Sequence, residues 1–142
     1  LGQLQEGDTA EIIGATIGGD LEADDAVMDR GMTIMPDGTH DSQIGGDLSL
    51  FSVKSSKSML IFGTKIEKRL ILHGAEIEGE LQCVSHEVWR MVVGGVIWLF
   101  RSHVSGRVSF DGITAHEGIK LTYANMDSGF SCLAVGQHVP RI

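Results

Sequence analysis

The sequence predicts an all-β protein, a parallel β-helix (β-solenoid) with about 22 residues in each coil. First, a short apolar-x-apolar pattern recurs at a step of 11 residues over most of the chain. Second, apolar and polar side chains alternate within the repeating unit, which indicates strands rather than helices. Third, 19 of 142 residues are glycine and only 2 are proline, roughly twice the usual ~7% share of glycine. We interpret this excess as recurrent tight bends between strands.

The 11-residue repeat occurs in three sets that are separated by two insertions. The pattern starts at Ala10, Leu21 and Met32; at Leu48, Met59, Leu70 and Leu81; and at Ile97, Val108, Ile119 and Phe130. The joins from Met32 to Leu48 and from Leu81 to Ile97 exceed the ordinary step, because each of them holds five extra residues. An antiparallel sandwich also alternates apolar and polar residues, but it does not predict eleven occurrences of one phase.

A longer period, four units plus one insertion, fixes how many units make one coil. Gly45-Gly46 matches Gly94-Gly95 in this register, and Leu48 matches Ile97. A step of this length returns the chain to the same side of the solenoid only if each coil has two units, because the step then equals two whole coils. The sequence therefore predicts about six coils of stacked parallel strands, about 4.8 Å apart. Right-handed coiling is expected, as for other parallel crossovers.

The unit at residues 74–84 shows the expected strand most clearly. Small or apolar residues occupy positions 75, 77, 79, 81 and 83, and three glutamates with one glutamine occupy the positions between them. A helix of period 3.6 would bury those glutamates. Each coil should bury two such apolar ladders, at roughly 1.5–3 kcal/mol for each fully buried side chain. We assign Gly45, Gly46, Gly79, Gly94 and Gly95 to corners, where positive φ or close approach of two coils requires glycine.

We expect residues 1–142 to form a single β-solenoid domain, with 1–9 as a candidate N-terminal cap and 134–142 as a C-terminal tail. No apolar run reaches the roughly 18 residues that a helix needs to span a bilayer. No secretory leader is visible, so a cytoplasmic location is expected. Because each coil contacts only its neighbours, the end coils expose strand edges that favour end-to-end association.

The net charge of −8 is concentrated at one end of the chain. Residues 1–50 contain eleven acidic residues against one basic residue, whereas residues 51–142 have a small positive excess. In a solenoid this imbalance lies along the axis, which favours head-to-tail contact. No lysine or arginine cluster is present, and binding to nucleic acid needs such a basic surface. We therefore predict no nucleic-acid partner.

The repeat style resembles that of right-handed β-helix proteins. The resemblance is carried by the phrase Ala-Glu-Ile-Glu-Gly-Glu-Leu-Gln-Cys at 75–83 and by Ile-Gly-Gly-Asp-Leu at 17–21 and 44–48, and it covers roughly residues 10–133. It is similar to bactofilins, which are polymer-forming bacterial cytoskeletal proteins, and to pentapeptide-repeat proteins. The first likeness implies a cytosolic filament built by end-to-end stacking. The second implies dimers and protein-surface mimicry. The unit length differs from that of both families.

The insertions at 36–41 and 85–90 place acid–base side chains at one edge of the solenoid, and 136–140 recur in the same phase. Within them, His40, Asp41, His86 and Glu87 are the catalytic candidates for an alternative interpretation, a carbohydrate-active or carbohydrate-binding β-helix. The segment His-Glu-Val-Trp-Arg lacks the second histidine of a zinc protease motif. A shared metal is disfavoured, because His40 and His138 lie four coils apart, about 19 Å.

A second alternative is a calcium-binding solenoid, because several carboxylates lie close together in the first coils. Calcium prefers such oxygen ligands. The candidate ligands are Asp20, Glu22, Asp24, Asp25 and Asp47. A solvated acidic surface is the simpler interpretation, and we predict no cofactor and no assigned metal.

The two cysteines, Cys83 and Cys132, occupy the same inward phase and are separated by two coils. Two coils place their Cα atoms about 10 Å apart, which exceeds the reach of a disulfide. We therefore expect two buried, reduced thiols.

The segment at 91–100 carries apolar residues in both rows, so we expect its outer face to be covered. Trp98 lies in the outward row, where the equivalent residue two coils earlier is Ser49. Aromatic residues and arginine are enriched in interface hot spots. The predicted interface residues are Trp98, Val96, Val92, Phe100, Trp89 and Arg90. The leading hypothesis is a non-enzymatic structural or protein-interaction protein that forms a homo-oligomer or binds a protein partner.

Overall fold

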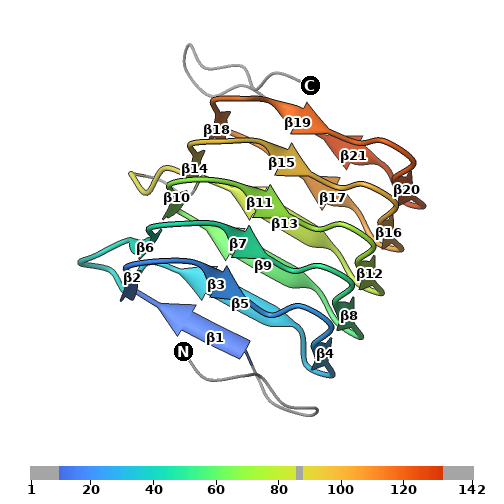
Figure 1. Cartoon of the computed structure of the whole chain (residues 1–142), viewed down its shortest axis with the longest axis horizontal. Coiled ribbons are helices and arrows are strands. Elements are labelled where there is room, and N and C mark those ends of the chain that lie inside the picture. The colour runs from blue at the N-terminus through green and yellow to red at the C-terminus, as the bar shows by residue number, and fades with distance from the viewer. Residues whose placement is uncertain (1–9, 86–87, 133–142) are drawn as a thin grey trace.

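A computed structural model describes residues 10–85 and 88–132, and all 21 strands in these ranges are parallel to their neighbours. The chain winds about one axis, with β1 and β21 at opposite ends of the stack (Figure 1). The structure therefore confirms the all-β parallel solenoid. The predicted cap at 1–9 and tail at 134–142 lie outside the described residues.

The strands form four sheets, one on each side of the coil, which we call sheets A to D. Sheet A contains β1 (Ala10–Ile13), β5 (Met32–Met35), β9 (Met59–Phe62), β13 (Leu81–Val84), β17 (Val108–Ser109) and β21 (Phe130–Ser131). Sheet B contains β2 (Thr16–Ile17), β6 (Ser42–Ile44), β10 (Thr64–Ile66), β14 (Val92–Val93) and β18 (Thr114–Ala115). Sheet C contains β3 (Leu21–Glu22), β7 (Leu48–Ser49), β11 (Leu70–Ile71), β15 (Ile97–Trp98) and β19 (Ile119–Lys120). Sheet D contains β4 (Val27–Met28), β8 (Lys54–Ser55), β12 (Glu76–Ile77), β16 (His103–Val104) and β20 (Asn125–Met126).

The strand register confirms that two 11-residue units make one coil. Ala10 pairs with Met32, a step of two units, and Met32 pairs with Met59, a step of two units and one insertion. The same alternation of short and long coils continues from Met59 to Leu81 and from Leu81 to Val108. The repeats starting at the eleven predicted positions therefore fall alternately on sheet A and sheet C.

The prediction of two buried ladders per coil was incomplete, because sheets B and D add two more. Ile44 and Ile66 of sheet B and Ile77 and Val104 of sheet D are almost fully buried. The predicted continuous strand at 74–84 is also wrong, since it is divided into β12 and β13 by a corner at Gly79. Sheets B and D escaped detection because serine or threonine occupies several of their buried positions, such as Ser42, Ser55 and Thr64, and interrupts the apolar-x-apolar pattern.

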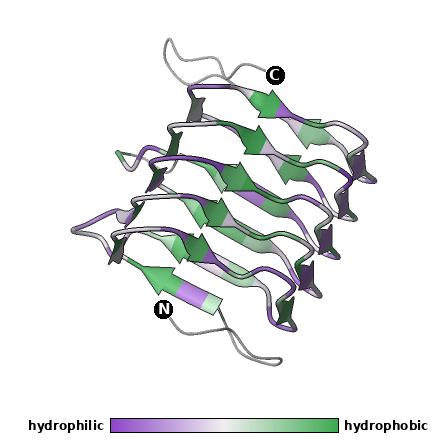
Figure 2. Cartoon of the chain, viewed as in Figure 1, coloured by the Kyte–Doolittle hydropathy of each residue, from purple (hydrophilic) through white to green (hydrophobic). Residues whose placement is uncertain are grey.

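The core is a column of stacked aliphatic side chains inside the coil. Leu50, Leu72, Ile34 and Ile61 have no exposed surface, and Figure 2 shows hydrophobic residues in the strands at every level of the stack. Most of the buried hydroxyls donate hydrogen bonds to backbone carbonyls, as Thr64 Oγ1 does to the Phe62 oxygen at 2.8 Å, and Ser131 Oγ donates to the Asp111 carboxylate. Polar groups in the core are thus paired, as burial requires.

The predicted corner glycines serve close approach rather than positive φ. A Cβ added to Gly45 would lie 2.7 Å from the Gly18 carbonyl oxygen, and Gly94 and Gly95 meet the carbonyls of Glu67 and Lys68 in the same way. None of these three glycines has a positive φ.

Left-handed backbone recurs instead at the corner that follows sheet C. Four side-chain-bearing residues adopt it at the same place in their coils: Asp25, Ser52, Arg101 and Tyr123, with φ between 56° and 61°. Gly74 is the equivalent residue of the remaining coil, with φ 68°. The repeated bend is therefore set by coil geometry, and glycine is used there only once.

The close approach of the coils makes Gly94→Ala destabilising. The new methyl group would overlap with the Glu67 carbonyl oxygen of the coil below, and such overpacking costs about 1–3 kcal/mol. Urea unfolding should show this loss as a lower transition midpoint with an unchanged slope.

Gly18→Ala is the matched control, because Gly18 occupies the same corner of the first described coil and nothing described lies within 4 Å of its added Cβ. Its free energy of unfolding should change by less than about 0.5 kcal/mol. Equal losses in the two variants would contradict the close-approach explanation.

Candidate functional site

Aromatic rings stack along the outer surface at the end of sheet C. The rings of Phe51 and His73 are 4.8 Å apart, His73 and Phe100 are 4.6 Å apart, and Phe100 and Tyr123 are 6.0 Å apart. Phe51, His73 and Phe100 hold the same position in successive coils. The carbonyl of each accepts a hydrogen bond from the backbone N–H of the residue at the left-handed bend of the coil before it. These three rings sit directly before the left-handed bend, and Tyr123 lies in it. We call the four residues the aromatic column.

Trp98 lies beside this column and confirms the prediction that it points outward. It follows the fully buried Ile97 in β15 and is itself partly buried. Its ring is 6.0 Å from His73 and 6.4 Å from Phe100. Arg101 also covers part of this surface, with its Cζ 5.1 Å from the centre of the Phe100 ring, a favourable cation–π arrangement.

This surface still presents large rings to solvent. Tyr123 is 77% exposed and Phe51 is 42% exposed. Ile71 of β11 pairs with Trp98 and extends the apolar surface along sheet C. We call the aromatic column together with Ile71 and Trp98 the aromatic side of the solenoid.

The predicted calcium ligands lie on the first two described coils, at and next to sheet C, and three of them hold the coils together. Asp20 Oδ1 accepts a hydrogen bond of 2.7 Å from the Asp47 backbone N–H. Asp24 Oδ1 accepts one from the Ser49 hydroxyl at 2.6 Å and one from the Phe51 N–H at 3.0 Å. These carboxylates therefore satisfy backbone and side-chain donors of the next coil.

Asp47 repeats this arrangement one coil higher. It accepts from the Arg69 backbone N–H at 2.9 Å and from the guanidinium, with Arg69 Nη2 2.7 Å from Asp47 Oδ2. The hydrogen bond from the Arg69 side chain holds the pKa of the Asp47 carboxyl below its usual value of 3.8. The fixed geometry comes from strand register, which places residues 20, 47 and 69 above one another.

Glu22 and Asp25 are the two predicted ligands whose side chains make no hydrogen bond or ion pair within the described ranges. Across residues 10–85 and 88–132, no three His, Cys, Asp or Glu side chains are grouped closely enough to hold a metal ion. Calcium binding stays a prediction.

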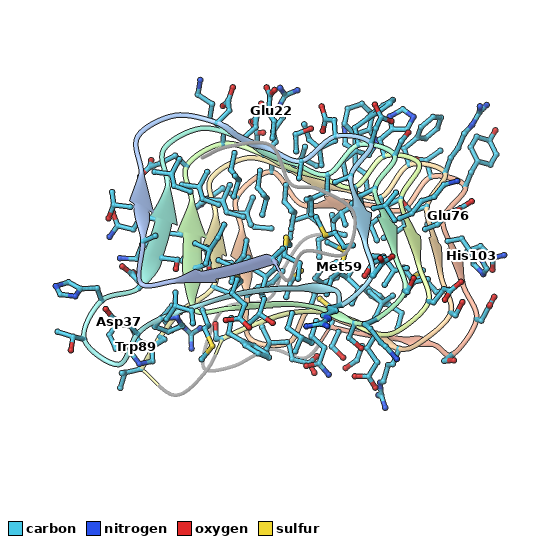
Figure 3. The ribbon with its side chains drawn as sticks, turned by 90° about the horizontal axis from the view of Figure 1, so that it is seen from below. Glu22, Asp37, Met59, Glu76, Trp89 and His103 are labelled. Atoms are coloured by element: carbon cyan, nitrogen blue, oxygen red, sulfur yellow. The ribbon has the colours of Figure 1, made fainter. Side chains whose placement is uncertain are left out.

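The predicted insertions lie at the corner between sheets A and B. Three coils turn this corner with a single glycine at positive φ, namely Gly14, Gly63 and Gly112. The other two coils, at 36–41 and 85–90, use six residues in place of one. Figure 3 shows Asp37 and Trp89 together at this corner, on a different side from Glu22.

The first insertion is a self-contained turn. Asp37 Oδ1 accepts hydrogen bonds from the backbone N–H groups of Thr39 and His40, at 2.7 and 2.6 Å, and the bond from His40, followed by that from Thr39, lowers the pKa of the Asp37 carboxyl. His40 is exposed, with its Nδ1 3.6 Å from Asp37 Oδ2, and Asp41 lies 3.5 Å from Lys65 Nζ. His86 and Glu87, the other catalytic candidates, lie outside the described residues, as does His138.

The second insertion is tied to the next coil. Ser85 Oγ donates to the Gly112 carbonyl at 2.6 Å, and Arg90 Nη2 donates to the same oxygen at 3.1 Å. Trp89 packs beside Gly63, where an added Cβ would lie 2.5 Å from the Trp89 Cβ and 3.2 Å from Pro36. The two insertions therefore meet on either side of the Gly63 corner.

The predicted interface residues do not form one face. Val92 lies on sheet B and Trp98 on sheet C, because the chain turns at Gly94 and Gly95 between them. Val96 is almost buried, at 9% exposed. Trp98 and Phe100 belong to the aromatic side, whereas Trp89 and Arg90 stand at the corner between sheets A and B. Treating 91–100 as one continuous strand was the error.

Phe51, His73 and Tyr123 were missed by sequence reasoning. The repeat spacing could have identified two of them, because Phe51 lies two coils before Phe100 and His73 lies one long coil before it. A second apolar surface was also missed on sheet A, where the register places Ile13, 50% exposed, beside Met35, 36% exposed. In contrast, sheet D carries Lys54, Glu76 and His103 in register on its outer face (Figure 3 labels the last two).

Both cysteines are free, as predicted. Cys83 is fully buried, and this burial raises the pKa of its thiol. Cys132 is only partly buried, so the prediction of burial is correct for one cysteine and too strong for the other. Its thiol pKa is also raised, first by burial and then by the negative charge of Asp111.

Comparisons with known protein families, curated proteins and solved structures gave no match. The parallel solenoid is therefore established by the structure alone, and the likeness to bactofilins and pentapeptide-repeat proteins is one of repeat style. In the described part of the chain, no helix is long and apolar enough to cross a membrane.

Asp47→Asn should lower the free energy of unfolding by about 1 kcal/mol near neutral pH, because the half-exposed Arg69 then loses its charged partner. The folded-state pKa of Asp47 is below 3.8, so its contribution is present above about pH 4 and is lost as the pH falls through that lowered value. The difference between wild type and variant, measured by urea unfolding, should shrink towards zero in acid.

Asp29→Asn is the control for this series, because Asp29 is exposed and has no described partner. It should show almost no difference from wild type at either pH. A loss for Asp47→Asn that persists unchanged in acid would exclude the ion pair as its cause.

Replacement of residues 36–41 by one glycine should leave the fold intact. The other coils make this corner with a single glycine, and the bonds of Asp37 lie within the insertion. The replacement removes the half-exposed pair of Asp41 with Lys65, worth at most about 1 kcal/mol, and the buried Pro36 beside Gly63. Circular dichroism and urea unfolding should both remain close to those of wild type.

Removal of 36–41 without the glycine is the matched control. The chain is then one residue short, so β6 must slip and present its buried side chains to solvent. This variant should unfold at a clearly lower urea concentration, and equal stability of the two deletions would show that the glycine corner does not define the coil.

Proposed function

We propose that this chain is a non-enzymatic protein-interaction solenoid that self-associates through its aromatic side. The observation that carries the proposal is the row of rings from Phe51 to Tyr123, whose two end members are exposed and whose successive members lie 4.6–6.0 Å apart across the coils. Isolated exposed hydrophobic residues are common, but a contiguous aromatic surface marks an interaction site.

The composition of this surface supports a protein contact. Trp, Tyr and Arg are the residues that most often dominate binding energy at interfaces, and Trp98, Tyr123 and Arg101 all contribute here. Their side chains are already held against the Phe100 ring. Ordering them on binding therefore costs less side-chain entropy than ordering isolated rings would cost.

The catalytic alternative receives less support from the described residues. His40 is paired with Asp37, and Asp41 is paired with Lys65, so both acid–base candidates have partners at an exposed turn. The side chain of His40 is 73% exposed, whereas substrate sites are usually concave and sheltered from water. A carbohydrate ligand that stacks on the aromatic side is the competing occupant in the experiment below.

End-to-end association is a second route to the same function. The first and last coils described each pair their strands on one side only; β1, for example, pairs only with β5 within residues 10–85 and 88–132. Unpaired strand edges are templates for pairing with another chain. The acidic start of the chain also favours contact with the opposite end of another copy.

The proposal predicts that Trp98→Asp abolishes self-association. A carboxylate in the centre of the aromatic side must lose its hydration when the surface is covered, which opposes binding. Sedimentation velocity or light scattering over a concentration series should show an oligomer for wild type and a monomer for the variant.

Val88→Asp is the matched control, because Val88 is 80% exposed but lies on the insertion between sheets A and B. It should keep the wild-type mass. A wild-type chain that stays monomeric at all concentrations would remove the proposal, and binding of a soluble oligosaccharide by that monomer would support the carbohydrate alternative. A Trp98→Asp variant that still associates would move the contact to the ends.

A further inference from the structure

The outer row of sheet C changes from negative to positive along the solenoid axis. Strand register places its five members in order, namely Glu22, Ser49, Ile71, Trp98 and Lys120. Glu22 and Lys120 are exposed and make no ion pair within the described ranges. Four strand spacings separate them, about 19 Å. An unpaired acid and an unpaired base therefore stand at opposite ends of one apolar surface.

The neighbouring positions show the same polarity. Asp25 lies at the corner of the acidic coil, and Arg101 lies at the equivalent corner three coils higher. The aromatic column begins with Phe51, one coil above Asp25, and its Phe100 lies on the same coil as Arg101. Sheet C thus has an acidic end, an aromatic middle and a basic end.

Resting on the proposed function, we infer that two copies of this chain pair face to face through sheet C, with their solenoid axes antiparallel. The twofold axis passes through the interface at β11. Glu22 of each copy then faces Lys120 of the second copy, and both ion pairs form at once. A parallel pair would instead place Glu22 against Glu22 and Lys120 against Lys120.

The twofold arrangement also fits the sizes of the side chains. An isologous contact places residue i opposite residue j and residue j opposite residue i. With the axis at β11, Ser49 faces Trp98 of the second copy, so the largest side chain of the row meets the smallest. In a parallel pair, the two Trp98 rings would occupy the same place.

The second column gives an equally consistent pairing. Phe51 faces Phe100 of the second copy, and His73 faces His73 near the axis. At the corner, Asp25 faces Tyr123 of the second copy, where the phenol can donate a hydrogen bond to the carboxylate. The contact therefore has an apolar centre and a polar, charged rim, as protein interfaces commonly do.

The area of sheet C limits the expected affinity of the dimer. Its outer row spans about 19 Å, so each copy contributes less than the ~800 Å² of a standard interface. We expect a dimer with a micromolar dissociation constant, so its population should depend on protein concentration. Its exposed rim pairs should also weaken as salt is added, because salt screens exposed charges.

The test is a charge exchange measured by sedimentation equilibrium on the full chain. Glu22→Lys and Lys120→Glu should each raise the dissociation constant at least about tenfold, because two attractive pairs become repulsive. The double variant carrying both changes should return to within about threefold of wild type. Mixing the two single variants in equal amounts should also restore dimers, as heterodimers in which each Lys faces a Glu.

Asp29→Lys controls for net charge, because it makes the same charge change on the same coil as Glu22→Lys but lies after β4 at the corner following sheet D. It should leave the dissociation constant unchanged. Thermal unfolding of each variant checks that these exposed substitutions keep the fold.

The outcomes separate this inference from the proposed function. If wild type associates and Trp98→Asp does not, but neither charge variant changes the dissociation constant, the aromatic contact stands and the antiparallel geometry is wrong. If each single variant homodimerises as well as wild type but binds the other single variant more tightly than it binds itself, the pair is parallel. A monomeric wild type overturns both proposals.

Discussion

The parallel hydrogen-bonded register between successive coils is the constraint on which the rest of the structure depends. Every strand residue of one coil stands above an equivalent residue of the coil before it, as the pairs Ile34–Ile61 and Ile61–Cys83 show. Side chains therefore form columns rather than isolated contacts. A column inside the coil becomes aliphatic core, and a column outside becomes a line of like or complementary groups. The aromatic column and the carboxylates of Asp20 and Asp47 are two results of the same register.

This constraint also decides where the chain can vary in length. An extra residue inside a strand would shift the residues after it by one position and turn the core outward. Extra residues at a corner change nothing in the stack. The corner between sheets A and B shows both solutions, because Gly14, Gly63 and Gly112 turn with one residue and the insertions at 36–41 and 85–90 use six. Short and long coils can then pair strand for strand.

The 11-residue period was sufficient to predict the solenoid, the two-unit coil and the positions of both insertions, because these follow from core residues that recur in one phase. The four-sided cross-section was not predictable in the same way, since buried hydroxyl residues such as Ser42 and Ser55 interrupt the apolar pattern on sheets B and D. The candidate site was predicted only in part. Trp98 was identified from its outward phase, whereas the stacking of Phe51 on His73 required the alternating coil lengths and the left-handed bend. The bonds of Asp24 to Ser49 and Phe51 depend on side-chain directions, which composition does not contain.

Contact through a side and contact through an end have different consequences for the axial charge. Head-to-tail stacking alone would add the charge asymmetry of each copy in the same direction and give a polar filament. Antiparallel pairing through sheet C would cancel that asymmetry within each pair, because the acidic start of one copy lies beside the basic end of the row in the other. If both contacts form, each end of the pair presents one start and one end of a solenoid, and stacking yields a filament without polarity. The placement of Glu22 and Lys120 on the outer row of sheet C thus bears on the symmetry of any larger assembly as well as on the dimer.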